Sequence, residues 1–326
     1  RRSSDLNGCL LSYFKNDSKG FAACLERVRS YKKIMLSKTS NYYKELLYGV
    51  AGYLYCLLEL QHRFHQESVH SDFQVNLEAD ILDMLEVLIE DGLSPYDKNL
   101  NLHNPPDDFR LYYTFHNKEY FGGAHGTFGV LYIIMRAFQL TKGFIEKQAP
   151  SFAEVLQLSV IHSLNFLIKH QLPSGNFPSS LSRKTNDLLV QFCHGSPGAV
   201  PCLLLATDVF KQNSIAEKCF NSALKAGEKI WKYGILKKGY GLCHGITGNA
   251  YAFLTLYRYT NDPIWLYRAH CFLTTKEHKY YTNFIDNYEF EDRYVVGKSD
   301  YPYSLMLGLA GDICFETALM FPENAR

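Results

Sequence analysis

Two Cys-His-Gly triplets stand in the second half of the chain, at Cys193-His194-Gly195 and Cys243-His244-Gly245. A further histidine, His125, also lies directly before a glycine, but no cysteine precedes it. Thiolates and imidazoles are the ligands that zinc prefers, and two cysteines with one histidine leave a fourth coordination position open for chemistry. One Cys-His pair alone indicates little, because a buried thiol beside a surface histidine is the simpler explanation. Two Cys-His pairs indicate a zinc site only if the fold brings them together.

A repeated glycine motif supplies a reason for them to meet. Gly-x-x-Gly precedes an apolar segment five times, at 49–52, 126–129, 195–198, 245–248 and 308–311. The first glycines are 77, 69, 50 and 63 residues apart, which is enough for two helices and a loop each. Repeats of such length are typical of stacked helical hairpins. The first glycine permits a tight turn into a helix, and the second allows a close approach of the backbone.

The pattern of apolar residues predicts two kinds of helix. The segments that follow the glycine turns are apolar nearly all round, as in buried helices, whereas 80–90 and 154–169 are amphipathic. Inner buried helices that alternate with outer amphipathic ones predict an all-α fold, the α/α toroid, a double-layered helical barrel of repeated hairpins. In a toroid the glycine turns lie at one end, so their cysteines and histidines would converge there. The residues alone favour zinc but leave the choice between His194 and His244 open.

Composition excludes several classes of protein. The chain has 326 residues with 34 basic and 33 acidic groups, a net charge of +1, which gives no reason to expect nucleic acid as a partner. No uninterrupted apolar run reaches the roughly 20 residues of a bilayer span, so we expect no transmembrane segment, while peripheral membrane contact stays open. Nine irregularly spaced cysteines indicate a reducing compartment. We expect a cytoplasmic protein, with the membrane surface or the nucleus as alternatives.

Several segments together carry a resemblance to a known family. They occur in the family's order, at Gly122–Gly126, Pro173–Pro178, Asp187–Gly198, Gly241–Phe253 and Pro302–Leu305. The combination resembles the eukaryotic lanthionine synthetase C-like family over nearly the whole chain. The resemblance implies a single α/α toroid domain over 1–326. The family ring has seven hairpin units and this chain has about five, so we expect the first two units to be missing.

The resemblance also implies a metal site and a reaction. It assigns zinc to Cys193, Cys243 and His244, and leaves His194 as a supporting residue beside the ligands. Family members add the thiol of glutathione to dehydroalanine and dehydrobutyrine residues of peptides or proteins. Zinc coordination converts a thiol to the nucleophilic thiolate. The enolate that forms needs a proton, for which histidine is suited, and the family's acid matches His125. A histidine that merely packs at the helix entry is the simpler alternative.

The resemblance also implies glutathione contacts, because Lys238 matches one of them and Asp300, with Lys298 nearby, falls in a second glutathione-contacting loop of the family. Lys238 would pair with a carboxylate of the tripeptide, and Asp300, with Lys298 nearby, would hold its ammonium group. Two positions depart from the family pattern, because Gly297 replaces an arginine and Leu307 replaces a glutamate. These departures support an alternative, a non-catalytic zinc- and glutathione-binding adaptor or signalling protein. A zinc-dependent subunit of the prenyltransferase kind is disfavoured, because the placement of cysteines and histidines matches the cyclase pattern.

Overall fold

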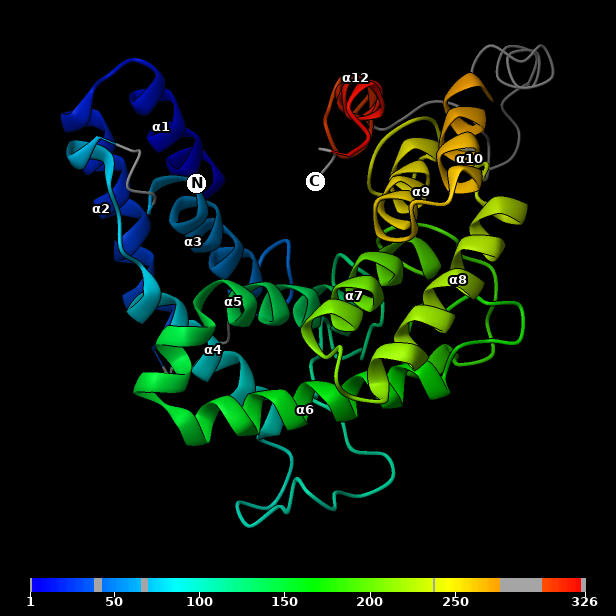
Figure 1. Ribbon diagram of the computed structural model, residues 1–326, viewed down its shortest axis with the longest axis horizontal. Coiled ribbons are helices and arrows are strands. Elements are labelled where there is room, and N and C mark those ends of the chain that lie inside the picture. Colours follow the sequence, from blue (N-terminus) through cyan, green and yellow to red (C-terminus); the bar gives the residue numbers. More distant parts are fainter. Residues whose placement is uncertain (1, 38–42, 66–69, 237, 276–300, 324–326) are drawn as a thin grey trace. The chain divides into compact units, whose positions relative to one another are not determined.

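The structure is a computed structural model that describes residues 2–37, 43–65, 70–236, 238–275 and 301–323 (Figure 1). Regular structure within these ranges is helical and includes no β-strand, apart from isolated bridge residues such as the pair Tyr120 and Ser180. The prediction of an all-α fold is therefore confirmed for the described part of the chain.

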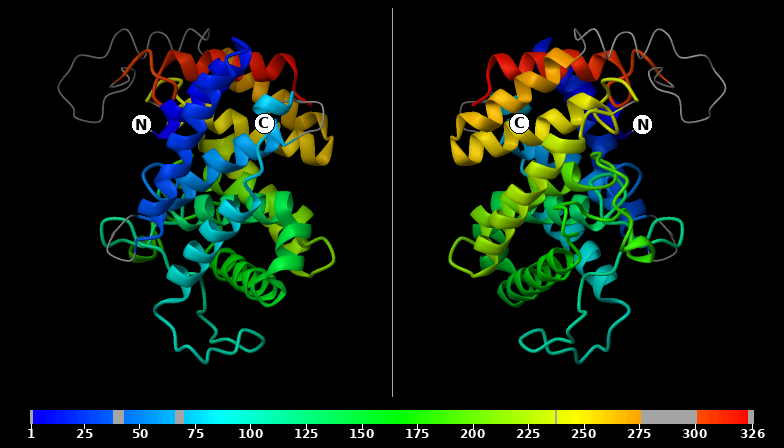
Figure 2. Two further views of the ribbon diagram at one scale, coloured as in Figure 1. Left: turned by 90° about the vertical axis from the view of Figure 1, so that its left-hand side faces the viewer. Right: turned by 90° about the vertical axis from the view of Figure 1, so that its right-hand side faces the viewer.

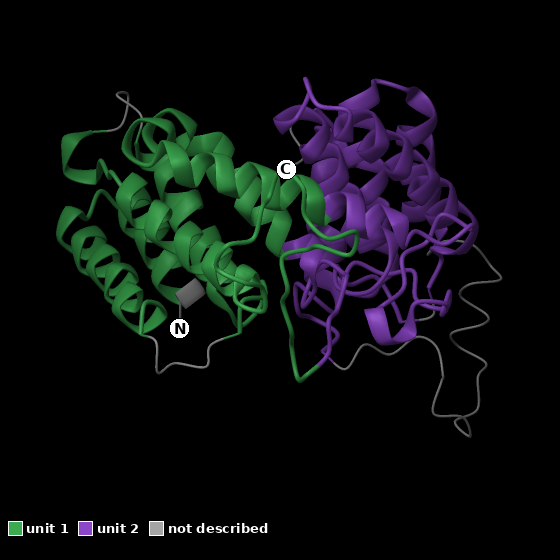
Figure 3. Cartoon of the chain, turned by 90° about the horizontal axis from the view of Figure 1, so that it is seen from below, with its two compact units in different colours: residues 1–117, 130–163 green, residues 118–129, 164–326 purple. Residues whose placement is uncertain are grey.

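The chain divides into two compact units (Figure 3). Unit 1 comprises Arg1–Asn117 and Val130–Ser163, and unit 2 comprises Lys118–Gly129 and Leu164–Arg326. Helices α5 (Thr127–Gln148) and α6 (Pro150–Lys169) contribute residues to both units. All the candidate site residues within the described ranges belong to unit 2.

Unit 1 is built from helical hairpins. Its helices are α1 (Arg2–Phe14), α2 (Ser18–Met35), α3 (Val50–Phe64) and α4 (Glu78–Leu93), with a short 3₁₀ helix η1 (Ser71–Phe73). Helix α1 packs on α2, and α3 packs on α4. Phe21 meets Phe64 and Phe73 edge-to-face, with ring centroids 5.0 and 5.3 Å apart, and forms an aromatic core between α2, α3 and η1.

Unit 2 continues the same construction. Its helices are α7 (Ser196–Val209), α8 (Ile215–Tyr233), α9 (Ile246–Thr260), α10 (Pro263–Thr274) and α12 (Leu309–Met320), with the 3₁₀ helix η2 at Leu181–Arg183. Helices α7 and α8 form one hairpin, and α9 and α10, side by side in Figure 2, form the next. Phe253 packs edge-to-face on Phe272 with ring centroids 4.9 Å apart. As expected, the helices after the glycine turns are the more buried partners of these hairpins.

The glycine turns show why the motif needs its second glycine. A Cβ atom at that position would overlap the backbone carbonyl oxygen six residues earlier in all five turns, at Gly52, Gly129, Gly198, Gly248 and Gly311. The first turn of each helix therefore lies directly against the loop that leads into it. Any side chain at this glycine would push the helix off its own loop.

Helices α5 and α6 are long and apolar enough, by length and composition, to cross a membrane. Within the most apolar window of each helix, 61% of α5 and 44% of α6 is buried inside the protein. The core helix of a globular fold passes the same test, so the two helices are weak support for a membrane span. The absence of a transmembrane segment stays a prediction.

Candidate metal centre

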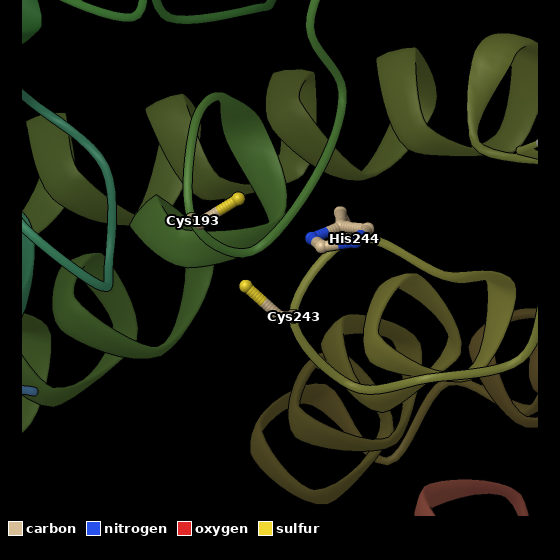
Figure 4. A group of neighbouring side chains, drawn as sticks. All are labelled: Cys193, Cys243 and His244. Atoms are coloured by element: carbon tan, nitrogen blue, oxygen red, sulfur yellow. The ribbon is translucent and has the colours of Figure 1, made fainter. Parts of the chain in front are cut away.

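Three of the predicted site residues lie together in unit 2. The ligand atoms of Cys193, Cys243 and His244 are all within 4.8 Å of one another. Figure 4 shows the two sulfur atoms and the imidazole turned toward a shared space, between the loop that precedes α7 and the loop that precedes α9. Cys193 is buried, whereas Cys243 and His244 are half-buried.

The donor set fits zinc. In tetrahedral zinc sites the Zn–S bonds are about 2.3 Å and the Zn–N bonds about 2.0–2.1 Å, which separates ligand atoms by about 3.3–3.8 Å. An upper limit of 4.8 Å between the ligand atoms is within a small side-chain rotation of that geometry. Two sulfurs and one nitrogen leave a fourth position for a substrate. The structure thus brings the three residues together, while their role as ligands stays a prediction.

The two thiols shift each other's pKa in opposite directions. A hydrogen bond with Cys243, added to burial, raises the pKa of Cys193 far above its ordinary range. The pKa of Cys243 is lowered to about 5, mainly by its hydrogen bond with Cys193 and also by His244, against the opposing effect of burial. Of the two thiols, Cys243 is therefore the one that loses its proton more easily. Since metal ligands must be deprotonated, Cys243 is the cysteine better prepared to bind a cation.

Backbone hydrogen bonds join the turns that carry these residues. The N–H of Cys193 donates to the carbonyl of Cys243 at 3.1 Å, and the N–H of Cys243 donates to Met306 at 2.8 Å. One turn earlier, Gly123 N–H donates to Phe192 at 3.0 Å. The four glycine turns of unit 2 form a hydrogen-bonded row, and the expected convergence of their cysteines and histidines is found there.

The three histidines of this row are neighbours. His125 is half-buried, and the pKa of His194 is lowered by burial, by His125 and by His244. The His194 Nδ1 atom is buried and has no hydrogen-bond partner among the described residues. The ring of Tyr120 lies 5.1 Å from that of His194. His194 follows Cys193 in the sequence, yet it is not part of the group that could hold a metal.

Sequence reasoning missed two side chains near the cysteines and could not place some others. Gln191 accepts a hydrogen bond from the Cys193 thiol at 3.3 Å, and Tyr120 contacts His194; neither belongs to a motif of metal ligands.

Lys238 is exposed. Its positive charge slightly lowers the pKa of Cys193, so Lys238 lies close enough to the centre to act on it electrostatically. Lys298 and Asp300, with Gly297, fall outside the described residues. Leu307 is half-buried and takes the place that histidine has in the three preceding turns.

A family model described as lanthionine synthetase C-like protein matches residues 8–326. The chain belongs to the lanthionine synthetase C-like family. Its predicted fold class, the α/α toroid of helical hairpins, is that of the lanthionine synthetase C-like proteins. The number of hairpin units that this chain contributes stays a prediction.

Two curated lanthionine synthetase C-like relatives are similar along most of this chain. Glutathione S-transferase LANCL1 of Danio rerio is 35% identical over 303 residues, which cover 93% of this chain and 65% of the relative. LanC-like protein GCL1 of Arabidopsis thaliana is 30% identical over 286 residues, which cover 86% and 56%. The chain spans less than two thirds of the length of either relative. Among solved structures, nisin cyclase is similar at 13% identity with a TM-score of 0.45, and covers 98% of this chain and 87% of its own.

Proposed function

We propose that the chain binds one zinc ion through Cys193, Cys243 and His244. We further propose that it adds glutathione, or a similar thiol, to dehydroalanine and dehydrobutyrine residues in peptides or proteins. The observation that carries the proposal is the meeting of three zinc-type ligand atoms within 4.8 Å, from two turns held by a backbone hydrogen bond. The Danio rerio relative is named as a glutathione S-transferase, which supports the choice of thiol. We place this activity in the cytoplasm.

The reaction is the addition of a thiol across a carbon–carbon double bond, with the sulfur and one hydrogen added and no group lost. When bound, zinc supplies the positive charge that keeps the incoming thiol ionised. The sulfur bonds to the β-carbon, the electron pair of the double bond moves onto the carbonyl oxygen, and a proton must then reach the α-carbon. His125 is the donor we propose, because it is half-buried in the same row of turns and lies electrostatically close to Cys243. A half-buried donor can deliver its proton to a substrate away from bulk water.

The tripeptide needs charged partners at its ends. Lys238 is an exposed cation near the Cys193 thiol, where it can attract a carboxylate of glutathione toward the centre. With Lys298 and Asp300, it makes up the set of glutathione contacts that we propose. A second candidate function is the non-catalytic adaptor, which the apolar Leu307 favours, since an aliphatic side chain in the row cannot carry a proton.

Metal analysis tests the shared premise of both functions. We expect about one zinc per chain in the purified protein and none in Cys243→Ala, because two ligands hold the ion too weakly. Cys314→Ala, which removes an exposed thiol on α12, is the matched control and should keep its zinc. Clearly substoichiometric zinc in the wild-type protein, or undiminished zinc in Cys243→Ala, would contradict the proposal.

Incubation with glutathione and a dehydroalanine peptide separates the two functions. The enzyme should convert the peptide to a product heavier by one glutathione, as measured by mass spectrometry. His125→Asn should keep zinc and lose rate by about 10²–10⁴-fold, the usual contribution of a general acid. His270→Asn, an exposed histidine on α10, should keep its full rate. A zinc-loaded, glutathione-binding chain that forms no adduct would favour the adaptor, and a full rate in His125→Asn would reassign the acid.

A further inference from the structure

The loop that carries Cys193 is closed differently from every other glycine turn. In the four other turns the first N–H of the helix donates directly to the carbonyl seven residues earlier, from Val50 to Tyr43, Thr127 to Tyr120, Ile246 to Gly239 and Leu309 to Pro302. In the loop before α7 the corresponding groups are Ser196 N–H and the Leu189 carbonyl. They are joined through the side chain of Asn176 instead.

Asn176 is fully buried and uses both ends of its amide. Its Oδ1 accepts from the backbone N–H of Ser196 and from the Ser196 hydroxyl, each at 2.9 Å. Its Nδ2 donates to the Leu189 carbonyl at 3.0 Å. The amide thus spans the loop, and Gly195 takes a φ of +116°, a backbone conformation open only to glycine. Cys193 lies between the two points that Asn176 holds.

A second buried asparagine holds the next carbonyl of the same loop. Asn249 on α9 is fully buried, and its Nδ2 donates to the carbonyls of Val190 and Gly234, both at 2.8 Å. Its own Oδ1 is buried with no partner among the described residues. An unsatisfied buried oxygen is costly, so the residue is useful here for its donor group. Helix α9 follows the turn of Cys243 and His244, so Asn249 ties the two ligand loops together.

Hydrogen bonds consequently restrain the backbone of this loop at most of its residues. Leu189 and Val190 give their carbonyls to the two asparagines, Phe192 gives its carbonyl to Gly123, and the Cys193 N–H donates to Cys243. Two residues before Leu189, the carboxylate of Asp187 pairs with the buried amine of Lys229 on α8 at 3.0 Å. A metal ligand on so restrained a loop is held in place before any ion arrives.

We propose that Asn176 and Asn249 are positioning residues that hold the loop 189–193, so that the Cys193 sulfur faces Cys243 and His244. The part of this inference that concerns metal affinity rests on the proposed zinc site. The part that concerns the loop itself does not, because the hydrogen bonds are made by the chain alone. Residues that orient metal ligands typically change metal affinity by about 10–100-fold when they are replaced.

The test uses Asn176→Leu and Asn249→Leu, which keep the side-chain size and remove both hydrogen-bonding ends. In the metal-free protein we expect amide hydrogen exchange across 189–194 to accelerate by about tenfold or more, because local opening becomes easier. Exchange across 239–244, the turn of Cys243, should change less. Competition with a chromophoric chelator should then show zinc affinity lower by about 10–100-fold.

Gln61→Met is the matched control. Gln61 is a buried amide in unit 1 that accepts from the Leu77 N–H at 2.7 Å, so its replacement also breaks a buried side-chain hydrogen bond, but far from the loop in sequence. It should lower thermal stability without changing exchange across 189–194 or zinc affinity. If a leucine variant fails to fold, Ser196→Ala removes only one of the bonds to Asn176 and should give a smaller change of the same sign.

Each arm of the experiment has its own consequence. Folded asparagine variants with unchanged exchange across 189–194 would overturn the inference about the loop. Faster exchange with unchanged zinc affinity would overturn the link between loop and metal. A wild-type chain that binds no zinc, yet shows the expected acceleration in the variants, would refute the proposed function and support the loop restraint.

Discussion

The turns of Cys193 and Cys243 share the sequence Cys-His-Gly-x-x-Gly but differ in their backbones. Before α9, the Ile246 N–H reaches the Gly239 carbonyl directly at 2.9 Å. Before α7, the side chain of Asn176 stands between the corresponding groups. The first glycine of the motif is extended at Gly245, with a φ of −107°, and left-handed at Gly195. Two turns with the same sequence spacing therefore carry their ligands at the same positions, but they differ in backbone conformation and in the hydrogen bonds that close them.

The sharpest test of this comparison replaces the histidines of the two turns. His244→Asn should abolish stoichiometric zinc binding, because His244 belongs to the ligand group. His194→Asn should keep about one zinc per chain, since His194 lies outside that group. Metal content of the two purified variants gives the answer directly. If His194→Asn lost its zinc while His244→Asn kept it, His194 would be the ligand in place of His244.

The next prediction concerns the thiols in the metal-free protein. Cys193→Ala removes the hydrogen bond that lowers the pKa of Cys243, so that pKa should rise from about 5 toward the ordinary cysteine value near 8.5. Alkylation of Cys243 in wild type should accordingly begin in mildly acidic solution, and in the variant only as the pH approaches alkaline values. Mass-spectrometric alkylation rates measured against pH check this shift. An unchanged profile in Cys193→Ala would mean that Cys193 does not lower the pKa of Cys243.

The smallest effect concerns the glycines. Gly195→Ala should destabilise the fold by about 3 kcal/mol or more, because its positive φ is strained for alanine and its Cβ would overlap Leu189 and press on Asn176. Gly239 also has a positive φ but has no atom near its absent Cβ, so Gly239→Ala should cost only about 1–2 kcal/mol. Chemical denaturation of both metal-free variants measures the difference. Equal losses would indicate that the loop before α7 yields to a side chain.

Much of the site could be predicted from the sequence because the repeat carries it. The five glycine pairs gave the helix starts, and the shared register gave the convergence of Cys193 with Cys243. The choice of His244 over His194 could not be made in this way, since both occupy the same position in their motifs. The choice depends on how far each imidazole lies from the sulfur atoms, and the loops set that distance.

The restraints on the loops were out of reach of sequence reasoning for a different reason. Asn176 lies 13 residues before Leu189 and Asn249 lies 59 residues after Val190, so their partners follow from packing and not from local spacing. An asparagine in a Pro-Ser-Gly-Asn segment most simply indicates a surface turn. Nothing in the sequence shows that this one is buried and bridges another loop. Lys298 and Asp300 lie where the structure describes no residues, so their role stays a prediction.

The contrast between fixed turns and variable connections has a practical consequence for engineering. The first helical N–H and the carbonyl it faces across the turn are seven positions apart in every turn, whether joined directly or through Asn176, whereas successive turns are 50 to 77 residues apart. Within this chain the connections thus differ in length, whereas the turns do not. Affinity tags, fluorophores or reporter peptides inserted into a connection such as 95–110 should leave metal affinity intact. A single residue inserted within any one of these turns should not be tolerated.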